Sequence, residues 1–394
     1  MQERTILRDL EAVLPWWQDV RVCAEDALKS RQPLTGLRVA IICIDLYRFD
    51  SISSSASEQA AVLITAGCEV QIVCNNHAGI DSPLIKPRED FNAADYDCVL
   101  YHYYVGDPLL ETVLNNSTRK AVFYQGITTP PEVYAPYSPE FVETCRQGLA
   151  QLDRLQRFDM VISGSDYNVE QMRAAGRQGE RRPVARMFPP IISVTRFVQT
   201  PRKLGPVPRR ILTVSRIFSS KNVEGVVRFA EALVQRTRTA TRLTIAGAKC
   251  EPSYVERLLA DMTTDPLLEV DICLRASDER VRGFYQQADI YACFSHHEGF
   301  CIPLVEAMAA GVPVVTHALT AIPQTMGGSG VIVEPFQHEE AAEKIWSVWQ
   351  DRSALTSLVL GQQVVFERQY KGSGIAGKLI DAIRDLVASQ GEAK

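Results

Sequence analysis

One stretch of 27 residues, 289–315, most constrains the fold of this chain, because it contains strand, loop, helix and strand in immediate succession. Residues 289–294 form a short apolar, aromatic-rich run typical of a buried strand, and Pro303 suits the first position of a helix. Gly311 and Pro313 end that helix after about two turns, and residues 312–315 resume an apolar strand. The amino terminus of the helix is therefore expected at the carboxyl edge of a parallel sheet.

Two carboxylates, Glu298 and Glu306, flank the start of this helix. In open α/β sheets ligands bind at the carboxyl edge, and the unpaired amides of a helix amino terminus favour anionic groups. The glutamates are suited to accept hydrogen bonds from hydroxyls rather than to meet phosphate charge. Hydroxyls beside phosphate predict a sugar nucleotide as the ligand.

The segments 298–300 and 306–309 resemble the paired-glutamate motif of retaining GT-B glycosyltransferases of family 4, the glycosyl transferases group 1, in their bacterial polysaccharide-type form. The family usually has Gly where this chain has Cys301. The resemblance implies a GT-B fold with two doubly wound, Rossmann-like α/β domains facing a cleft. It also implies that Glu298 contacts the transferred sugar and Glu306 the ribose, with further donor contacts from Gly299, Phe300, Cys301 and Ile302.

A second match lies at residues 209–222, where a predicted strand ends in two cations, Arg216 and Lys221. This segment resembles the one that opens the second domain of the family, in which the equivalent residues hold the diphosphate. Negative charge builds on that leaving group as the glycosidic bond breaks, so cations there stabilise the transition state. The resemblance thus implies that Arg216, Lys221 and Glu298 are catalytic and that no metal is needed.

The rest of the second half alternates helix and strand as a nucleotide-binding domain should. Helices are expected at 223–235, 253–262 and 278–288, and strands at 242–247 and 268–274. Gly247 and Arg275 follow two of these strands, where the family places phosphate and base contacts. An ordinary turn is the alternative for each of these two residues.

The length of 394 residues suits two domains. Strands expected at 37–44, 69–74, 97–102, 120–124 and 160–163 make the first half a second doubly wound fold, and five prolines between 188 and 208 indicate an interdomain connection. The predicted division is a leader at 1–35, an acceptor-side domain at 36–188, a linker at 189–208, a nucleotide-sugar domain at 209–370 and a last helix at 371–394. As in the family, that helix is expected to cross back to the first domain.

The acceptor side offers two candidates, His102 and Gln125, each at a strand end that runs into a polar turn. Gln125 occupies the position where some polysaccharide-type relatives have His, and an amide cannot titrate. For His102, a core or turn histidine with its hydrogen bonds satisfied is favoured over an acceptor-site role. Residues 163–168 resemble a serine-containing strand end of the family, but a helix cap is the favoured interpretation.

Composition excludes several other classes. The net charge of -5 gives no basic footprint for nucleic acid, no apolar run approaches a membrane span, and residues 1–5 lack the shape of a signal peptide. The ten cysteines contain no Cys-x-x-Cys pair, so reduced buried thiols are expected and zinc is not. The adjacent His296 and His297 are interpreted as loop residues rather than metal ligands. A cytoplasmic location is expected, with peripheral contact at the inner membrane face as the alternative.

An amphipathic leader precedes the first strand, with apolar residues at helical spacing at Ile6, Leu7, Leu10, Val13, Leu14 and Trp17. Its polar face mixes acidic and basic residues and lacks the cationic bias that anionic lipid favours. We expect it to pack on the first domain or on another subunit, with membrane contact as the less favoured alternative.

The expected reaction is sugar transfer from a nucleotide-diphosphate sugar, in its UDP or GDP form, to a hydroxyl acceptor that is a glycan, a lipid-linked group or a small molecule. The family transfers with retention, and no protein nucleophile is evident, which fits a front-face displacement. The alternatives are a nucleotide-sugar epimerase or phosphorylase on a similar fold, and a noncatalytic protein that binds sugar nucleotides. The two glutamates also suggest glycoside hydrolysis, which the neighbouring cations disfavour.

Overall fold

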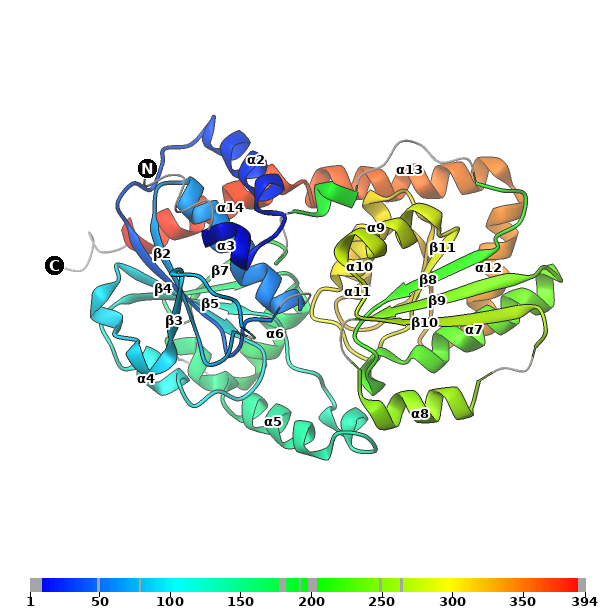
Figure 1. Ribbon diagram of the computed structural model, residues 1–394, viewed down its shortest axis with the longest axis horizontal. Helices are drawn as coiled ribbons and strands as arrows, with labels where there is room; N and C mark the ends of the chain where they lie inside the picture. The colour runs from blue at the N-terminus through cyan, green and yellow to red at the C-terminus, as the bar shows by residue number, and fades with distance from the viewer. Residues whose placement is uncertain are drawn as a thin grey trace. The chain divides into compact units, whose positions relative to one another are not determined.

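The computed structural model describes residues 9–47, 50–77, 79–176, 182–190, 193–197, 204–247, 250–262 and 265–388. The chain divides into two compact units. Unit 1 takes its described residues from 1–127, 144–196 and 370–394, and unit 2 takes its own from 128–143 and 197–369. Each is a parallel sheet covered by helices (Figure 1).

The sheet of unit 1 has seven parallel strands in the order β3-β2-β1-β4-β5-β6-β7. Its central strands are mostly apolar, as expected for a sheet buried on both faces, whereas the edge strands β3 and β7 are partly exposed. The register places Val39 of β1 opposite Val70 and Cys98. The strands are β1 Arg38–Ile42, β2 Glu69–Cys74, β3 Ile85–Pro87, β4 Cys98–Tyr103, β5 Arg119–Tyr124, β6 Met160–Ser163 and β7 Val184–Met187.

The helices of unit 1 lie before, between and after these strands in the chain. They are α2 Trp17–Leu28, α3 Ser51–Thr65, α4 Leu110–Leu114, α6 Asp166–Ala175 and α14 Gly372–Ala388, while α5 Pro139–Ala150 runs from unit 2 into unit 1. Short 3-10 turns are η1 Arg88–Asp90, η2 Ala93–Asp95 and η4 Leu152–Arg157, and η5 Ser193–Phe197 ends at the boundary between the units. The side chain of Ser165 accepts a hydrogen bond from Asn168 N, which confirms the predicted helix cap at α6.

The leader packs within unit 1. Leu10, Val13, Leu14 and Trp17 are buried in the same apolar core as the sheet, and α2 packs against α14 and α3. Ile6 and Leu7 lie outside the described residues. Among the two packing alternatives, the described part of the leader therefore uses the first domain.

The last helix belongs to unit 1 although the helix before it, α13 Arg352–Gln369, belongs to unit 2. Arg31, just after α2, pairs with Asp381 of α14 at 2.9 Å, and α14 contributes Ile375, Leu379 and Ile383 to the core of unit 1. The predicted return of the C-terminal helix to the first domain is confirmed.

The sheet of unit 2 has six parallel strands in the order β10-β9-β8-β11-β12-β13. They are β8 Arg210–Val214, β9 Thr241–Gly247, β10 Leu268–Leu274, β11 Ile290–Cys293, β12 Val314–His317 and β13 Val331–Val333. The helices are α7 Val223–Thr237, α8 Pro252–Ala260, α9 Asp278–Gln287, α10 Ile302–Ala309, α11 Ile322–Met326, α12 His338–Gln350 and α13, with 3-10 turns η3 Pro131–Tyr134 and η6 Ser219–Lys221. The predicted repeated βα winding is confirmed in both halves.

The grouping differs from the predicted boundaries at Thr128–Glu143, which the sequence places inside the first domain and the structure places with unit 2. Two contacts explain this. The Ser138 hydroxyl donates to Glu251 Oε1 at 2.7 Å, and the rings of Tyr137 and Tyr254 meet edge-to-face with centroids 5.1 Å apart. Both partners come from the start of α8 or just before it, so this excursion is fixed by side chains that no local pattern reveals.

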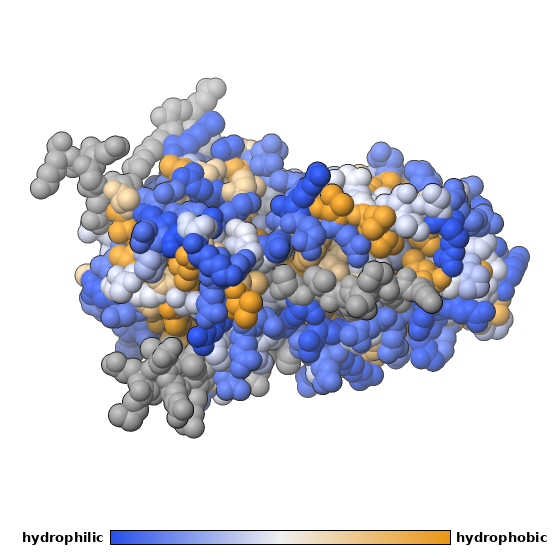
Figure 2. Space-filling model, turned by 90° about the horizontal axis from the view of Figure 1, so that it is seen from above, coloured by the Kyte–Doolittle hydropathy of each residue, from blue (hydrophilic) through white to orange (hydrophobic). Residues whose placement is uncertain are grey.

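The described helices include none that is both long and apolar enough to cross a membrane. The face shown in Figure 2 is largely hydrophilic, with small apolar areas between. Large apolar side chains exposed to solvent include Val22 on α2 and Leu360 and Val364 on α13. Scattered apolar residues of this kind are normal on a globular surface.

Candidate active site

The predicted site residues of unit 2 follow four neighbouring strands at one edge of the sheet. Arg275 follows β10, Gly247 ends β9, Arg216 and Lys221 follow β8, and Glu298 follows β11. All four strands are parallel, so their carboxyl ends meet at the same edge. The alternation of the sequence thus brings together residues that are up to 82 positions apart.

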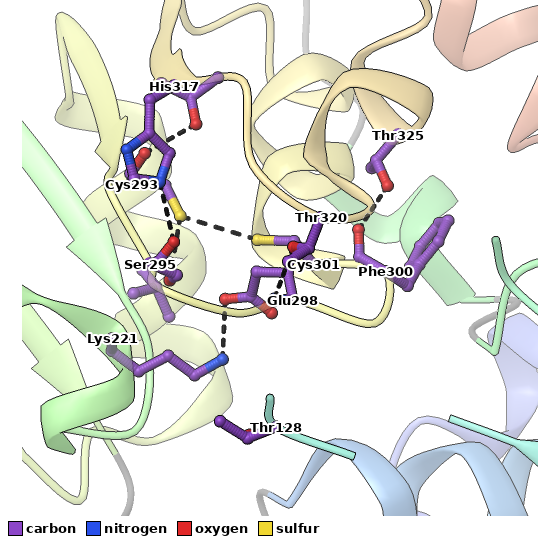
Figure 3. A network of polar contacts seen from close by, with 12 residues as sticks. Thr128, Lys221, Cys293, Ser295, Glu298, Phe300, Cys301, His317, Thr320 and Thr325 are labelled. Atoms are coloured by element: carbon purple, nitrogen blue, oxygen red, sulfur yellow. Dashed lines mark hydrogen bonds and ion pairs between the residues drawn. The ribbon is translucent and has the colours of Figure 1, made fainter. Parts of the chain in front are cut away.

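The centre of the site is an ion pair between Lys221 and Glu298 (Figure 3), in which Lys221 Nζ lies 2.7 Å from Glu298 Oε1. The side chains are only 14% and 11% exposed. Burial alone raises the pKa of Glu298, but the charge and hydrogen bond of Lys221 outweigh it and bring that pKa below its ordinary value. Burial alone lowers the pKa of Lys221, but the charge and hydrogen bond of Glu298 together outweigh burial and bring that pKa above its ordinary value. Both groups are therefore charged near neutral pH.

Arg216 supplies a second cation beside this pair. Its guanidinium lies 5.1 Å from the ring centroid of Phe218. Repulsion between the positive charges of Arg216 and Lys221 offsets part of the rise in the lysine pKa. The side chain is half-buried, and no described carboxylate forms an ion pair with it. Glu298 balances the charge of Lys221 but not that of Arg216. The positive charge of Arg216 beside the pair suits an anionic ligand.

Lys221 is held by the turn that leads into α7. Asn222 adopts a left-handed conformation with φ 46°, caps α7 through Gly225 N, and donates its side-chain amide to Phe294 O at 2.8 Å. His296 N donates to Ser220 O at 2.9 Å. The loop after β8 is therefore tied to the loop after β11 on both sides of Lys221.

The loop that carries Glu298 is fixed by threonines beyond β12. Glu298 N donates to Thr320 Oγ1 at 3.0 Å, and the Thr325 hydroxyl donates to Phe300 O. Sequence reasoning missed both threonines, whose only signal is their position in the turn after β12 and in the helix that follows. They fix the backbone on either side of Gly299, which is half-buried.

Cys301 has φ 70°, a left-handed conformation that favours glycine, and directly precedes α10. This gives a physical reason for the glycine that the resembled family usually has at this position. The Cys301 side chain is buried, and its Sγ lies 3.9 Å from Cys293 Sγ at the end of β11. Ile302, the first residue of α10, is half-buried, and Phe300 is buried.

Glu306 lies on the second turn of α10 and is 8% exposed. The Tyr285 hydroxyl donates to Glu306 Oε2 at 2.9 Å and also contacts Pro303 O at 3.2 Å. Tyr285 was not singled out in the sequence, and it fixes the orientation of the carboxylate relative to the helix start. The structure thus holds the two predicted glutamates by separate partners, Lys221 for one and Tyr285 for the other.

Gly247 and Arg275 form the outer part of this edge. A Cβ at position 247 would lie 2.4 Å from Ser215 O, so the close approach of two strand ends requires glycine there. Arg275 N donates to Gly247 O at 2.8 Å, and the Arg275 side chain is exposed. The geometry places both residues at the predicted edge, and their roles as donor contacts stay predictions.

His102 and Gln125 lie in the core of unit 1 or beside it. His102 is completely buried, stacks on Phe123, and has a partner at each ring nitrogen: the Gln125 amide donates to Nδ1 at 2.8 Å, and Nε2 donates to Gln59 Oε1 at 2.9 Å. Burial lowers the pKa of His102 to about 3. This arrangement matches the alternative of a satisfied core histidine. Gln125 is half-buried and spends its amide on His102.

Comparison with known proteins identifies a matching family and several relatives. Residues 200–359 match the family described as Glycosyl transferases group 1. Among curated proteins, the chain is 28% identical over 143 residues to the O-antigen chain mannosyltransferase B of Escherichia coli, covering 36% of this chain and 37% of that protein. It is 26% identical over 276 residues to the putative colanic acid biosynthesis glycosyltransferase WcaL of Escherichia coli K12, covering 68% of this chain and 64% of that protein.

The first curated relatives are matched over only 37% to 64% of their own length. Solved structures with the same fold include a sucrose-phosphate synthase from Thermosynechococcus elongatus, with a TM-score of 0.70 at 16% identity over 90% of this chain and 100% of that one. WaaG, a glycosyltransferase involved in lipopolysaccharide biosynthesis, aligns with a TM-score of 0.64 at 15% identity over 88% of this chain and 99% of that one. At this identity the structures show the fold alone, which is GT-B.

Proposed function

We propose that this chain, whose residues 200–359 match the family described as Glycosyl transferases group 1, is a glycosyltransferase that moves a sugar from a nucleotide-diphosphate sugar to a hydroxyl acceptor. Transfer retains the anomeric configuration and needs no metal. The observation that carries the proposal is the charged pair of Lys221 and Glu298 at the carboxyl edge of β8 and β11, with Arg216 beside it and the amino terminus of α10 behind it.

Lys221 and Arg216 are proposed to hold the diphosphate. An ammonium group has three donors, so Lys221 can keep its bond to Glu298 and still donate to a phosphate oxygen. Arg216 has no carboxylate partner among the described residues and adds a planar, permanently charged donor set. Both cations stabilise the charge that builds on the leaving group.

Glu298 is proposed to accept a hydrogen bond from a hydroxyl of the transferred sugar, and Glu306 to accept hydrogen bonds from the ribose. Glu298 is suited to this because its lowered pKa keeps it ionised and therefore an acceptor. The Tyr285 hydroxyl orients Glu306 through its hydrogen bond to Oε2. Gly247, Arg275, Gly299, Phe300, Cys301 and Ile302 complete the proposed donor-binding set.

In the proposed front-face step the acceptor oxygen bonds to the anomeric carbon as the bond from that carbon to the phosphate oxygen breaks. The departing phosphate oxygen takes the acceptor proton, and the diphosphate leaves with its charge held by Lys221 and Arg216. Because attack and departure use the same face of the sugar, configuration is retained. Glycoside hydrolysis would need a carboxylic acid with a raised pKa, whereas the pKa of Glu298 is lowered.

GDP-mannose is the proposed first donor to test, followed by UDP-sugars. The support comes from the names of relatives, which include a GDP-mannose:cellobiosyl-diphosphopolyprenol alpha-mannosyltransferase of Xanthomonas oryzae, 29% identical over 154 residues. A structural neighbour with a TM-score of 0.64 is described in complex with UDP and glucose. The acceptor is proposed to be a glycan or lipid-linked hydroxyl, and the lipid-linked form would bring a cytoplasmic enzyme to the inner membrane face.

The test is a panel of GDP-, UDP-, ADP- and dTDP-sugars, first for binding by calorimetry and then for transfer to saccharide and polyprenyl-diphosphate-linked acceptors. NMR of the product should show the same anomeric configuration as the donor. An epimerised sugar nucleotide with no acceptor product would support an epimerase instead. Binding without turnover across all acceptors would support a noncatalytic protein, and no binding of any donor would refute the proposal.

A further inference from the structure

Two cysteine thiols face each other beside the Lys221–Glu298 pair (Figure 3). Cys293 Sγ, at the end of β11, lies 3.9 Å from Cys301 Sγ, at the start of α10. Each residue is 5% exposed. The proposed transfer mechanism assigns a sulfur role to neither, and the left-handed backbone at Cys301 is costly for any side chain other than glycine. A pair of thiols at this place therefore calls for a chemical explanation.

Glu298 completes a set of three ligand atoms. One atom from each of Cys293, Glu298 and Cys301 lies within 4.8 Å of the others. Two thiolates bound tetrahedrally to zinc, with bonds of about 2.3 Å, are about 3.8 Å apart. The 3.9 Å between the two sulfurs is therefore close to the spacing of two thiolates on one zinc ion. A disulfide would need the sulfurs to approach to about 2.0 Å, a much larger movement for two buried side chains.

The charges also balance. Two thiolates and one carboxylate carry three negative charges, and a divalent cation together with Lys221 supplies three positive ones. A buried cluster with no net charge avoids the penalty of an isolated charge. Sulfur ligands select borderline and soft metals such as zinc over magnesium, which prefers oxygen. Three protein ligands leave a fourth position for water, as in open zinc sites.

We propose that Cys293, Glu298 and Cys301 form a binding site for Zn²⁺ and that its occupancy inhibits the protein. Binding releases the two thiol protons to solvent and leaves both sulfurs as thiolate ligands. The inhibitory part rests on the proposed function: Glu298 ligates the metal and no longer accepts a hydrogen bond from the donor sugar. The site thus makes sugar transfer sensitive to the supply of free zinc.

The first test measures metal binding on the full chain, purified with a chelator and kept reduced by a phosphine. Zn²⁺ is titrated against a chromophoric chelator, and Co²⁺ serves as a spectroscopic probe of thiolate ligands in a tetrahedral field. We expect one tight site per chain and no competition from Mg²⁺. Cys301→Gly and Cys293→Ser should each weaken zinc binding at least tenfold, since loss of a ligand should cost no less than the roughly 10- to 100-fold found for outer-shell partners.

Cys301→Gly is the sharper variant, because glycine suits the φ of 70° and should fold at least as well as the parent. Cys250→Ser is the matched control, as Cys250 is a free cysteine outside the cluster. Zinc affinity that is unchanged in Cys301→Gly and in Cys293→Ser would overturn the proposal. A wild-type chain that binds Zn²⁺ no better than Mg²⁺ would do the same.

The second test separates this site from the proposed function. With an active donor and acceptor, we expect Zn²⁺ to inhibit wild type and Cys250→Ser and to leave Cys301→Gly at least tenfold less sensitive. Equal sensitivity of all three would overturn the inhibitory role. If tight zinc binding is found but no donor panel gives transfer, the metal site stands and the proposed function fails. If transfer is found without zinc binding, the reverse holds.

Discussion

Lys221 Nζ lies 2.7 Å from Glu298 Oε1, and the two residues are 77 positions apart in sequence. Their strands, β8 and β11, are neighbours and parallel, so the loops that follow them meet. In the proposed function, Lys221 is the cation that holds a diphosphate and Glu298 is the acceptor for a sugar hydroxyl. Its two members should therefore fail in different ways when each is replaced.

Glu298→Gln should separate nucleotide binding from transfer. Removal of the carboxylate frees the Lys221 charge, so the affinity for the nucleoside diphosphate product should be unchanged or higher. Transfer should fall by about 10²–10³-fold, as when one preorganised polar contact to the reacting group is lost. Calorimetry with GDP or UDP checks the nucleotide affinity, and steady-state rates check the transfer. A variant that loses nucleotide affinity while keeping wild-type turnover would contradict the assignment.

Lys221→Ala should destabilise unit 2 as well as weaken ligand binding, because it leaves a buried carboxylate without its partner. The expected loss in the free energy of unfolding is about 3 kcal/mol, at the low end for a broken buried pair because both side chains keep some exposure. Denaturant unfolding checks this. The double variant Lys221→Ala/Glu298→Gln should recover part of the loss, and a double variant as unstable as the sum of the singles would argue against coupling.

Cys301→Gly should raise stability. A non-glycine residue at φ 70° costs roughly 1–2 kcal/mol of backbone strain, which the substitution relieves, less the packing of the lost thiol. The matched control is Cys273→Gly in β10, a buried cysteine in a strand, which should lower stability. Thermal unfolding of both variants gives the comparison. A lower melting temperature for Cys301→Gly than for wild type would show that the thiol packing outweighs the strain.

Gly247→Ala and Gly283→Ala should have opposite effects. At position 247 a Cβ would lie 2.4 Å from the backbone oxygen of Ser215, so the strand ends must move apart at a cost of about 1–3 kcal/mol. Gly283 lies in α9 with nothing within 4 Å of the new Cβ, so alanine should stabilise by about 1 kcal/mol through helix propensity. Chemical denaturation checks both signs, and nucleotide binding should weaken only in Gly247→Ala. Equal stabilities would contradict the close approach.

His102 should stay neutral well below the ordinary range of histidine. Burial lowers its pKa to about 3, so between about pH 6.5 and pH 3 the unfolded chain binds a proton there that the folded chain does not. Stability from this residue is therefore complete above pH 6.5 and is lost as pH falls toward 3, at about 1.4 kcal/mol per pH unit. Nitrogen NMR should show an Nε2–H tautomer that persists at pH 5. Protonation of His102 near pH 6 would contradict its burial between Gln59 and Gln125.

Much of the fold was predictable because long apolar runs alternate with amphipathic helices. The edge strands β3 and β7 were missed, since three or four residues at a sheet edge carry little hydrophobic signal. The segment Thr128–Glu143 was placed in the wrong half of the molecule, because its contacts with Glu251 and Tyr254 are non-local. Element type follows from local pattern, whereas domain membership here depends on side chains far apart in sequence.

The charged residues of the candidate site could be identified from the sequence, whereas the residues that hydrogen-bond to them could not. Lys221, Glu298 and Glu306 stand at strand ends and helix starts, where position alone suggests a ligand. Tyr285 and Thr320 gave no such signal, because an aromatic residue in a helix and a threonine in a turn are common. The thiol pair was missed for a related reason: a spacing of eight residues matches no short metal motif, and only the loop between Cys293 and Cys301 closes the distance.

The most direct measurement of the central claim is the affinity for nucleoside diphosphates, by calorimetry, of wild type, Lys221→Ala and Lys344→Ala. Lys344 on α12 is exposed and pairs with Glu340. Its replacement therefore removes one positive charge from a residue outside the candidate site. We expect wild type and Lys344→Ala to bind GDP or UDP with the same affinity. We expect Lys221→Ala to lose about 10- to 100-fold, the size of one charge-assisted hydrogen bond. Binding by Lys221→Ala that equals wild type, with the fold intact, would show that Lys221 does not hold the diphosphate.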